Sequence, residues 1–260
     1  TNPEKPPKLI AEITDDQLGF TTTNVDIVKR RAPSYSNGKY EQPAFNQWYL
    51  AFGSGPFGLG GPQSRIAQTT ATSTQNAQLF LFDLQSKKLK RFASSAANSF
   101  VGGITVTDWN RDYIDDVIYF GTVGGSQSAP SGQLLRAALT LNSTGAAMTF
   151  SPVLDVSNQP FSAPPMTRID NQFNHWVFAG TGRYFHDADG KVQVSNSFYG
   201  VKESKDSLGA LPTTAQSKSK LIDVSNIQIY TNGEIRTLSG GQVFIHGSEP
   251  IKNSTQMTSA

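Results

Sequence analysis

The sequence predicts an all-β protein with the architecture of a β-propeller, and three observations support this fold class. The chain of 260 residues is rich in Ser, Thr, Gly and aromatic residues, which favour strands and turns. Its 23 Gly and 14 Pro interrupt the chain throughout, and stretches rich in helix-forming residues are scarce. A strand that runs into a glycine turn and is followed by a second strand recurs along the chain.

The recurring unit begins with a strand of aromatic and β-branched residues and continues, after a polar loop, with a second short apolar strand. The first strands are Trp48–Gly55, Asp116–Gly125 and Trp176–Phe185, and the second strands are Gln78–Leu84, Gln133–Leu139 and Ser197–Lys202. A weaker fourth unit comprises Ile227–Leu238 and Gly240–Gly247, with a hairpin turn at Asn232–Gly233.

The spacing of these units predicts blades with long loops between their strands. Successive units begin about 60 to 70 residues apart, whereas a minimal four-stranded propeller blade takes about 40 to 45 residues. Closure of such blades into a ring protects the edges of the sheets. A β-sandwich with three similar hairpins is the alternative interpretation.

The expected organisation is one propeller-like domain over residues 9–250, incomplete or modified, between a linker and a tail. Residues 1–8 are rich in Pro and charge, as linkers are, and residues 251–260 lack a hydrophobic pattern. Because the chain begins without Met or a leader, it is expected to be a portion of a longer protein. The insert Gly55–Ala77 is expected to be a mobile surface loop, since no helical pattern follows its glycines.

One short acidic loop carries the spacing of a calcium site. Calcium takes six to eight oxygen ligands, and side chains at alternate positions of a turning loop converge on one ion. In the loop that precedes the strand Val117–Phe120, the side-chain ligands would be Asp108, Asn110, Asp112 and Asp116. Ile114 would contribute its carbonyl oxygen.

Two features of this loop leave a second interpretation open. Calcium loops favour Gly directly after the third ligand, where the backbone turns left-handed, and this chain has Tyr113 there. Asp115 falls one position off the register, so it is expected to face solvent or to support the ligands. The alternative to a metal site is an acidic turn held by hydrogen bonds from its own backbone. A second acidic stretch, His186–Lys191, lacks the later ligands and is interpreted as a plain hairpin loop.

The composition argues against several other classes of protein. A net charge of +2 is too small to indicate nucleic-acid binding, and the basic residues of Val28–Arg31 are interpreted as a solvated strand end. The absence of Cys excludes disulfides, thiolate zinc sites and a Cys nucleophile. No apolar run approaches the roughly 20 residues of a membrane span.

No constellation of residues in the sequence indicates an active site, so the protein is not expected to be an enzyme. The three His residues lie far apart without the spacing of metal ligands. The sequence contains no Gly-x-Ser-x-Gly elbow and no glycine-rich phosphate loop with Lys.

The succession of motifs resembles the C-terminal β-propeller of the PilY/PilC family of type IV pilus biogenesis proteins and tip adhesins. The resemblance covers roughly 6–229. Its most specific feature is a combination of three motifs: Leu18–Thr21, the acidic loop before Val117–Gly121, and the pair Gly180–Phe185 and Ser197–Gly200. In chain order the motifs are Pro6–Thr21, Trp48–Gly55, Ala77–Leu89, Thr107–Thr122, Gln159–Asp170, Trp176–Phe185 and Asn196–Ser204.

The resemblance implies a non-enzymatic role at the tip of a type IV pilus. It implies that Asp108, Asn110, Asp112, Asp116 and the Ile114 carbonyl bind Ca²⁺, whose occupancy biases pilus extension against retraction. It also implies that minor pilins are partners and that the protein is exported through the periplasm to the cell surface. A receptor on a host or other surface is not identified by the resemblance.

Two other propeller functions remain as alternatives to the pilus function. A quinoprotein dehydrogenase is also a propeller with calcium, and it would need a quinone pocket with stacking aromatic residues. A carbohydrate-binding or integrin-like propeller would be expected to repeat the acidic loop in several blades, whereas this sequence has one good loop.

Overall fold

The computed structural model describes residues 9–31, 34–36, 39–41, 46–58, 62–142, 145–192, 194–203, 210–225, 227–229, 234–237 and 243–245. The chain divides into two compact units, 1–216 and 217–260. The expected linker 1–8, the expected tail 251–260 and the predicted turn at Asn232–Gly233 lie outside the described residues.

Strands dominate the described residues, which confirms the all-β class. The first sheet has the order β1 (Asp26–Arg31), β4 (Asn46–Gly53), β5 (Gln78–Asp83) and β6 (Leu89–Ala93), and a separate short hairpin joins β2 (Ser34–Ser36) to β3 (Lys39–Glu41). The second sheet has the order β15 (Gln216–Ser217), β11 (Gly145–Asp155), β10 (Leu134–Asn142), β8 (Val117–Gly125) and β7 (Ser99–Thr107), with β9 (Pro130–Ser131) beside β8.

The third sheet of the first unit is formed by β12 (Met166–Ile169), β13 (His175–Gly180) and β14 (Phe198–Glu203). The second unit contains the short turn η2 (Lys218–Lys220) and a sheet of β16 (Ile227–Ile229), β17 (Glu234–Thr237) and β18 (Val243–Ile245). Within the described residues no sheet closes on itself, so a closed ring of blades stays a prediction.

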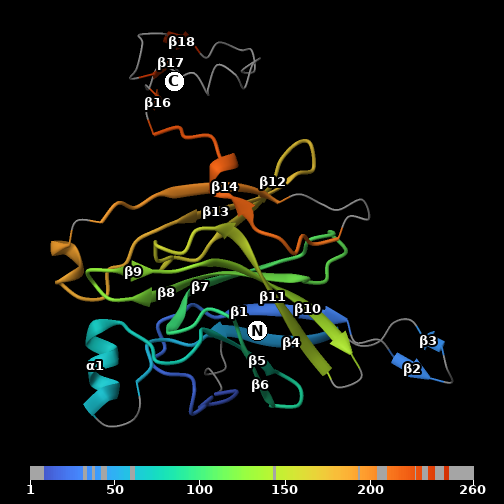
Figure 1. Cartoon of the computed structure of the whole chain (residues 1–260). Helices are drawn as coiled ribbons and strands as arrows, with labels where there is room; N and C mark the ends of the chain where they lie inside the picture. Colours follow the sequence, from blue (N-terminus) through green and yellow to red (C-terminus); the bar gives the residue numbers. More distant parts are fainter. Residues whose placement is uncertain are drawn as a thin grey trace, which may run out of the picture. The chain divides into compact units, whose positions relative to one another are not determined.

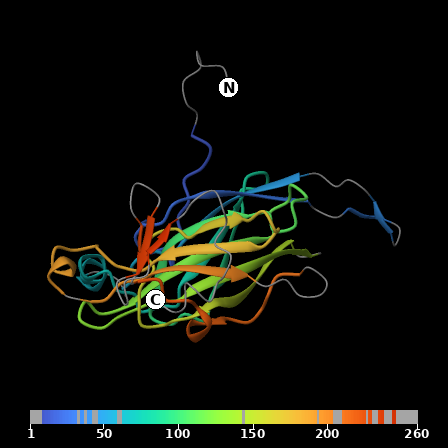
Figure 2. The ribbon, with the colours of Figure 1, turned by 90° about the horizontal axis from the view of Figure 1, so that it is seen from above.

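The three predicted strand units of the first unit are confirmed as antiparallel neighbours. β4 pairs with β5, β8 pairs with β10, and β13 pairs with β14. The three sheets lie as successive layers in chain order (Figure 1), because β7 of the middle sheet contacts β1, β4 and β5 on one side and β12 on the other. Figure 2 shows α1 at one end of these layers and the β2–β3 hairpin at the opposite end.

The middle sheet is buried on both faces, which explains the uninterrupted apolar run of β8. Ile118 and Phe120 point into the core shared with the first sheet, where they join Val28, Leu79 and Leu81. Tyr119 points the other way, toward the third sheet. A strand covered on both faces has no solvent side, so it shows no alternation of polar and apolar residues.

Glycines in the strands of the repeated units allow close approach of neighbouring segments. A Cβ at Gly121 would lie 2.4 Å from the Cβ of Phe161, and one at Gly53 would lie 2.3 Å from the Cβ of Val101. Any side chain at these positions would therefore push the neighbouring segment away, which explains why glycine follows the aromatic residues of these strands.

One helix corrects the prediction for the glycine-rich insert. Helix α1 (Pro62–Thr70) lies inside Gly55–Ala77, where a mobile loop without a helix was expected. Ala67 and Ala71 are buried, so the helix packs against the body of the unit. The sequence pattern missed it because Ala67, the buried residue among the described side chains of the helix, is small and gives little hydrophobic periodicity, whereas Pro at the first helical position is favourable.

A buried ion pair connects the second and third sheets. The Nη1 atom of Arg136 on β10 donates to both carboxylate oxygens of Glu203 on β14 at 2.7 Å, and each side chain is 1% exposed. Arg136 also donates to Ser151 Oγ and to the carbonyl oxygen of Thr214, and Tyr119 donates its hydroxyl to Glu203. Burial raises the pKa of Glu203 above its usual value, and the charge of Arg136 opposes this shift.

The substitution Glu203→Gln is expected to lower the free energy of unfolding by about 3–5 kcal/mol, because it leaves the Arg136 guanidinium buried without its counter-charge. Urea denaturation followed by circular dichroism measures this difference. Asp16→Asn is the matched control, since Asp16 is paired with Arg91 at the surface and its carboxylate is 84% exposed. Equal unfolding midpoints for the two variants would show that the pair does not join the sheets.

Candidate metal centre

The acidic loop connects β7 to β8 at one edge of the middle sheet. Thr107 and Val117 are register partners at the end of this antiparallel pair, so the loop comprises residues 108–116. The backbone N–H of Asp116 donates to the carbonyl oxygen of Thr107 at 3.0 Å and closes the loop. The strand therefore begins directly after the last acidic residue, as the sequence predicted.

Three of the predicted ligand residues converge. Asp108, Asp112 and Asp116 each place a carboxylate oxygen within 4.8 Å of the others, and no other group of three potential acidic, His or Cys ligands is found in the described residues. Asn110 lies in the same loop and accepts a hydrogen bond at 2.9 Å from the backbone N–H of Asp112. The backbone N–H of Ile114 donates to Asp112 at 2.9 Å, and the Ile114 side chain is buried.

Backbone N–H groups curl the loop around the first carboxylate. Asp108 Oδ1 accepts from the N–H groups of Arg111 at 2.7 Å and Asp112 at 3.2 Å, and Asp108 Oδ2 accepts from that of Tyr113 at 2.7 Å. These are the hydrogen bonds of an acidic turn. They also fix the carboxylate at the centre of the loop, which brings the other two carboxylates toward it.

Asp116 is the member of the three carboxylates that contacts a cationic side chain. Its Oδ2 accepts from the backbone N–H of Trp109 at 3.1 Å, and its Oδ1 lies 3.2 Å from Nη1 of Arg30. Burial raises the pKa of Asp116 above its usual value, whereas the backbone N–H of Asn110 and the positive charge of Arg30 lower it. Arg30 therefore supplies part of the charge balance of the loop.

Arg30 and Lys29 on β1 were not identified from the sequence as part of the site. Asp115 accepts from the backbone N–H of Lys29 at 2.7 Å and donates its own N–H back to the Lys29 carbonyl at 2.9 Å. Arg30 also donates to the carbonyl oxygen of Asp115. The interpretation of this basic segment as a solvated strand end is thus wrong for Arg30, whose side chain is 15% exposed. Asp115 supports the loop and does not belong to the three converging carboxylates.

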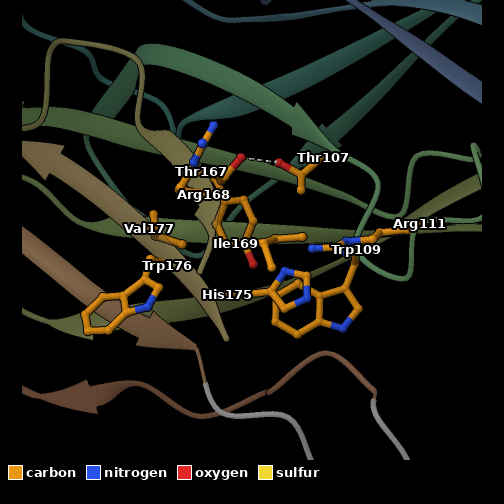
Figure 3. Close-up of a pocket in the computed structure, with 10 residues that line it drawn as sticks. Thr107, Trp109, Arg111, Thr167, Arg168, Ile169, His175, Trp176 and Val177 are labelled. Carbon is orange, nitrogen blue, oxygen red and sulfur yellow. Dashed lines mark hydrogen bonds between the residues drawn. The ribbon is translucent and has the colours of Figure 1, made fainter. Parts of the chain in front are cut away.

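The opposite side of the loop packs against the third sheet. The ring of Trp109 stacks on His175 at the start of β13, with 3.8 Å between centroids, and the Arg111 guanidinium lies 5.2 Å from the ring centre of Phe173. Beside this contact is a pocket of about 350 Å³. Figure 3 shows the imidazole of His175 against the indole of Trp109, with the hydroxyls of Thr107 and Thr167 facing each other above them.

The second acidic stretch forms an ion pair and a short turn. The turn η1 spans Asp189–Lys191. Asp189 lies 3.0 Å from Nε of Arg183 and accepts from the backbone N–H groups of Phe185 and His186. This stretch lies in the connection between the antiparallel strands β13 and β14, as expected of a hairpin loop, and the connection contains a short helical turn.

No protein-family model, curated protein or solved structure matches the chain. Within the described residues no helix is long and apolar enough to span a bilayer.

The loop contains backbone strain at the position where the sequence departs from the usual calcium pattern. Tyr113 has φ 66°, in the left-handed region, and its side chain is 82% exposed. The substitution Tyr113→Gly is therefore expected to raise the free energy of unfolding by about 1 kcal/mol, since Gly adopts this conformation without steric cost. Thermal and urea unfolding measure the effect.

Tyr113→Ala separates the strain from the loss of the ring. Ala keeps a Cβ at positive φ, so it is expected to give no gain in stability. If the Gly and Ala variants were equally stable, the tyrosine backbone would not be strained in solution.

Proposed function

We propose that this chain is a calcium-binding β-propeller domain of a type IV pilus biogenesis or tip-adhesin protein of the PilY/PilC type. The observation that carries the metal site is the convergence of Asp108, Asp112 and Asp116 within 4.8 Å. The pilus role is supported by the ordered set of motifs that resembles that family. The role is non-enzymatic: it concerns pilus assembly, the balance of extension and retraction, and attachment to surfaces.

The donor set of the loop fits Ca²⁺ in its chemistry. Calcium is a hard cation that takes carboxylate, amide and carbonyl oxygens, and it tolerates irregular arrangements of six to eight of them. Asp108, Asp112 and Asp116 would hold the ion through carboxylates, Asn110 through its amide oxygen and Ile114 through its backbone carbonyl. Bound Ca²⁺ supplies positive charge to a loop of acidic side chains.

The charge of the loop also favours a cation. Three carboxylates at this separation repel one another, and Arg30 contacts only Asp116 among them. A divalent ion between the carboxylates converts that repulsion into attraction. Affinity in the range of roughly 10⁻⁴–10⁻³ M, as in extracellular calcium modules, would suit a protein exposed outside the cell.

A cation at this place would stabilise the junction of three sheets. The loop joins β7 to β8, Asp115 ties it to β1, and Trp109 packs on β13. Calcium occupancy would therefore change how firmly the sheets are held together. In a pilus-tip protein such a change biases the contact with its partners, which are minor pilins of the tip complex, at the outer surface of the cell.

Calcium binding is expected to depend on the converging carboxylates and not on acidity in general. Isothermal titration should give one site per chain, and Asp112→Asn and Asp116→Asn should each weaken it by about tenfold or more, because each removes a charged ligand. At 100 times the dissociation constant, calcium should stabilise the fold by about 2.7 kcal/mol.

The matched control is Asp187→Asn, which removes an exposed carboxylate away from the loop and should leave the titration unchanged. Unaltered calcium uptake in both loop variants would refute the proposed ligands.

The pilus role predicts a phenotype in the cell that produces this protein. Deletion of the gene should reduce the number of surface pili and the motility that depends on pilus retraction. Complementation with the Asp112→Asn variant should restore the protein level and shift the balance of extension and retraction, whereas the Asp187→Asn variant should behave as the unaltered protein. Electron microscopy measures the number of surface pili, and motility assays measure the movement that depends on pilus retraction. Normal piliation after deletion would contradict the assignment to pilus biogenesis.

A further inference from the structure

Among the described residues of the first unit, the outer face of the third sheet is aromatic and accessible. Along β13 and β14 the side chains alternate between buried and accessible positions, and along β12 the accessible positions are 166 and 168. Phe198 is 74% exposed and Met166 is 63% exposed. The accessible positions of the three strands form what we call the aromatic face: Met166, Arg168, Trp176, Phe178, Gly180, Phe198, Gly200 and Lys202.

The rings of the aromatic face lie nearly parallel across the sheet. Trp176 and Phe178 have ring centres 6.2 Å apart and an interplanar angle of 11°, and Phe178 and Phe198 have ring centres 6.3 Å apart and an angle of 14°. Phe178 extends over Gly200, where an added Cβ would lie 3.0 Å from its ring. The glycine leaves room for the ring to lie low on the sheet.

The first ring of the row is held in a fixed orientation. The indole Nε1 of Trp176 donates to Asp170 Oδ2 at 2.9 Å, and Asp170 also accepts from the backbone N–H groups of Gln172 and Asn174. A ring fixed before binding loses little conformational freedom when a ligand stacks on it, which favours affinity.

Two cations and one carboxylate lie around Trp176. Arg168 and Lys202 are the register partners of Trp176 on its two sides, and both are exposed. The carboxylate of Asp170 accepts hydrogen bonds from Trp176 and Asn174. Within the described residues neither cation forms an ion pair with a carboxylate. A row of aromatic rings with two such cations beside its first ring is complementary to a ligand with flat apolar surfaces and negative charges.

We propose that the aromatic face binds an acidic polysaccharide, with sugar rings stacked on Trp176, Phe178 and Phe198 and uronate carboxylates paired with Arg168 and Lys202. The apolar C–H face of a pyranose ring matches the face of an aromatic side chain, and carboxylates form charge-assisted hydrogen bonds with Arg and Lys. The proposal goes beyond the calcium-dependent role and does not depend on it.

The observations favour a polysaccharide over single-stranded nucleic acid as the occupant of such a surface. Single-stranded nucleic acid also stacks on aromatic rings, but its affinity comes from neutralising several phosphates, and this face carries two cations in a chain of net charge +2.

The test is a titration of the chain with two uronate polymers of different linkage, hyaluronan oligosaccharides and polygalacturonate oligosaccharides, in the presence of a calcium chelator. Tryptophan fluorescence and affinity electrophoresis measure binding. Trp176→Ala and Phe198→Ala should each weaken binding by about tenfold, because each removes a stacking ring. Arg168→Gln and Lys202→Gln should each weaken it by about threefold or more.

The matched controls are Tyr184→Ala, which removes a 71% exposed ring elsewhere, and Lys191→Gln, which removes an exposed cation elsewhere. Both should bind as the unaltered chain. Phe198 is highly exposed, so its variant is expected to fold normally even if the Trp176 variant does not; thermal unfolding verifies this.

Four results would overturn the proposal. These are failure to bind either uronate polymer, equal affinity for neutral chitin oligosaccharides, tighter binding of an oligothymidylate, and formation of dimers that Phe198→Ala dissociates. Because the chelator is present throughout, a failure here is distinct from a failure of calcium binding.

Discussion

One electrostatic constraint governs this region of the protein: three carboxylates are held within 4.8 Å of one another at the start of a buried strand. Their repulsion must be offset, because β8 directly after them is buried on both faces and cannot shift. Backbone N–H groups of the loop offset part of it at Asp108, and Arg30 offsets part of it at Asp116. A divalent cation would offset the rest, and this is why we propose that the loop binds a metal ion.

The loop also connects the two proposed sites physically. Trp109 extends from it to His175 at the start of β13, and Arg111 extends to Phe173 in the turn between β12 and β13. The same turn holds Asp170, which orients Trp176 on the aromatic face. A cation that orders the loop would therefore also order one wall of the pocket. The buried pair of Arg136 and Glu203 holds the third sheet to the second on the same side.

The sequence was sufficient for the features that depend on local pattern. Three strand pairs followed from aromatic runs ending in glycine, and the three carboxylates followed from alternate spacing, since neighbours in a turn determine both. The partners supplied by distant segments could not be predicted. The sequence pattern indicates only that Arg30 lies at the solvated end of a strand. Its contact with Asp116 exists because β1 lies beside the loop. His175 likewise lacks a metal-ligand spacing, and its role is to stack on Trp109. Helix α1 was missed because Ala67, the buried residue among its described side chains, is small.

A crystal structure of the chain grown with CaCl₂ tests the central claim most directly. The account predicts a single ion among Asp108, Asp112 and Asp116, with oxygen ligands at about 2.3–2.6 Å that include the Asn110 amide and the Ile114 carbonyl. Anomalous scattering identifies the ion. An empty loop at millimolar calcium, with the three carboxylates turned apart or held only by backbone N–H groups and Arg30, would contradict it.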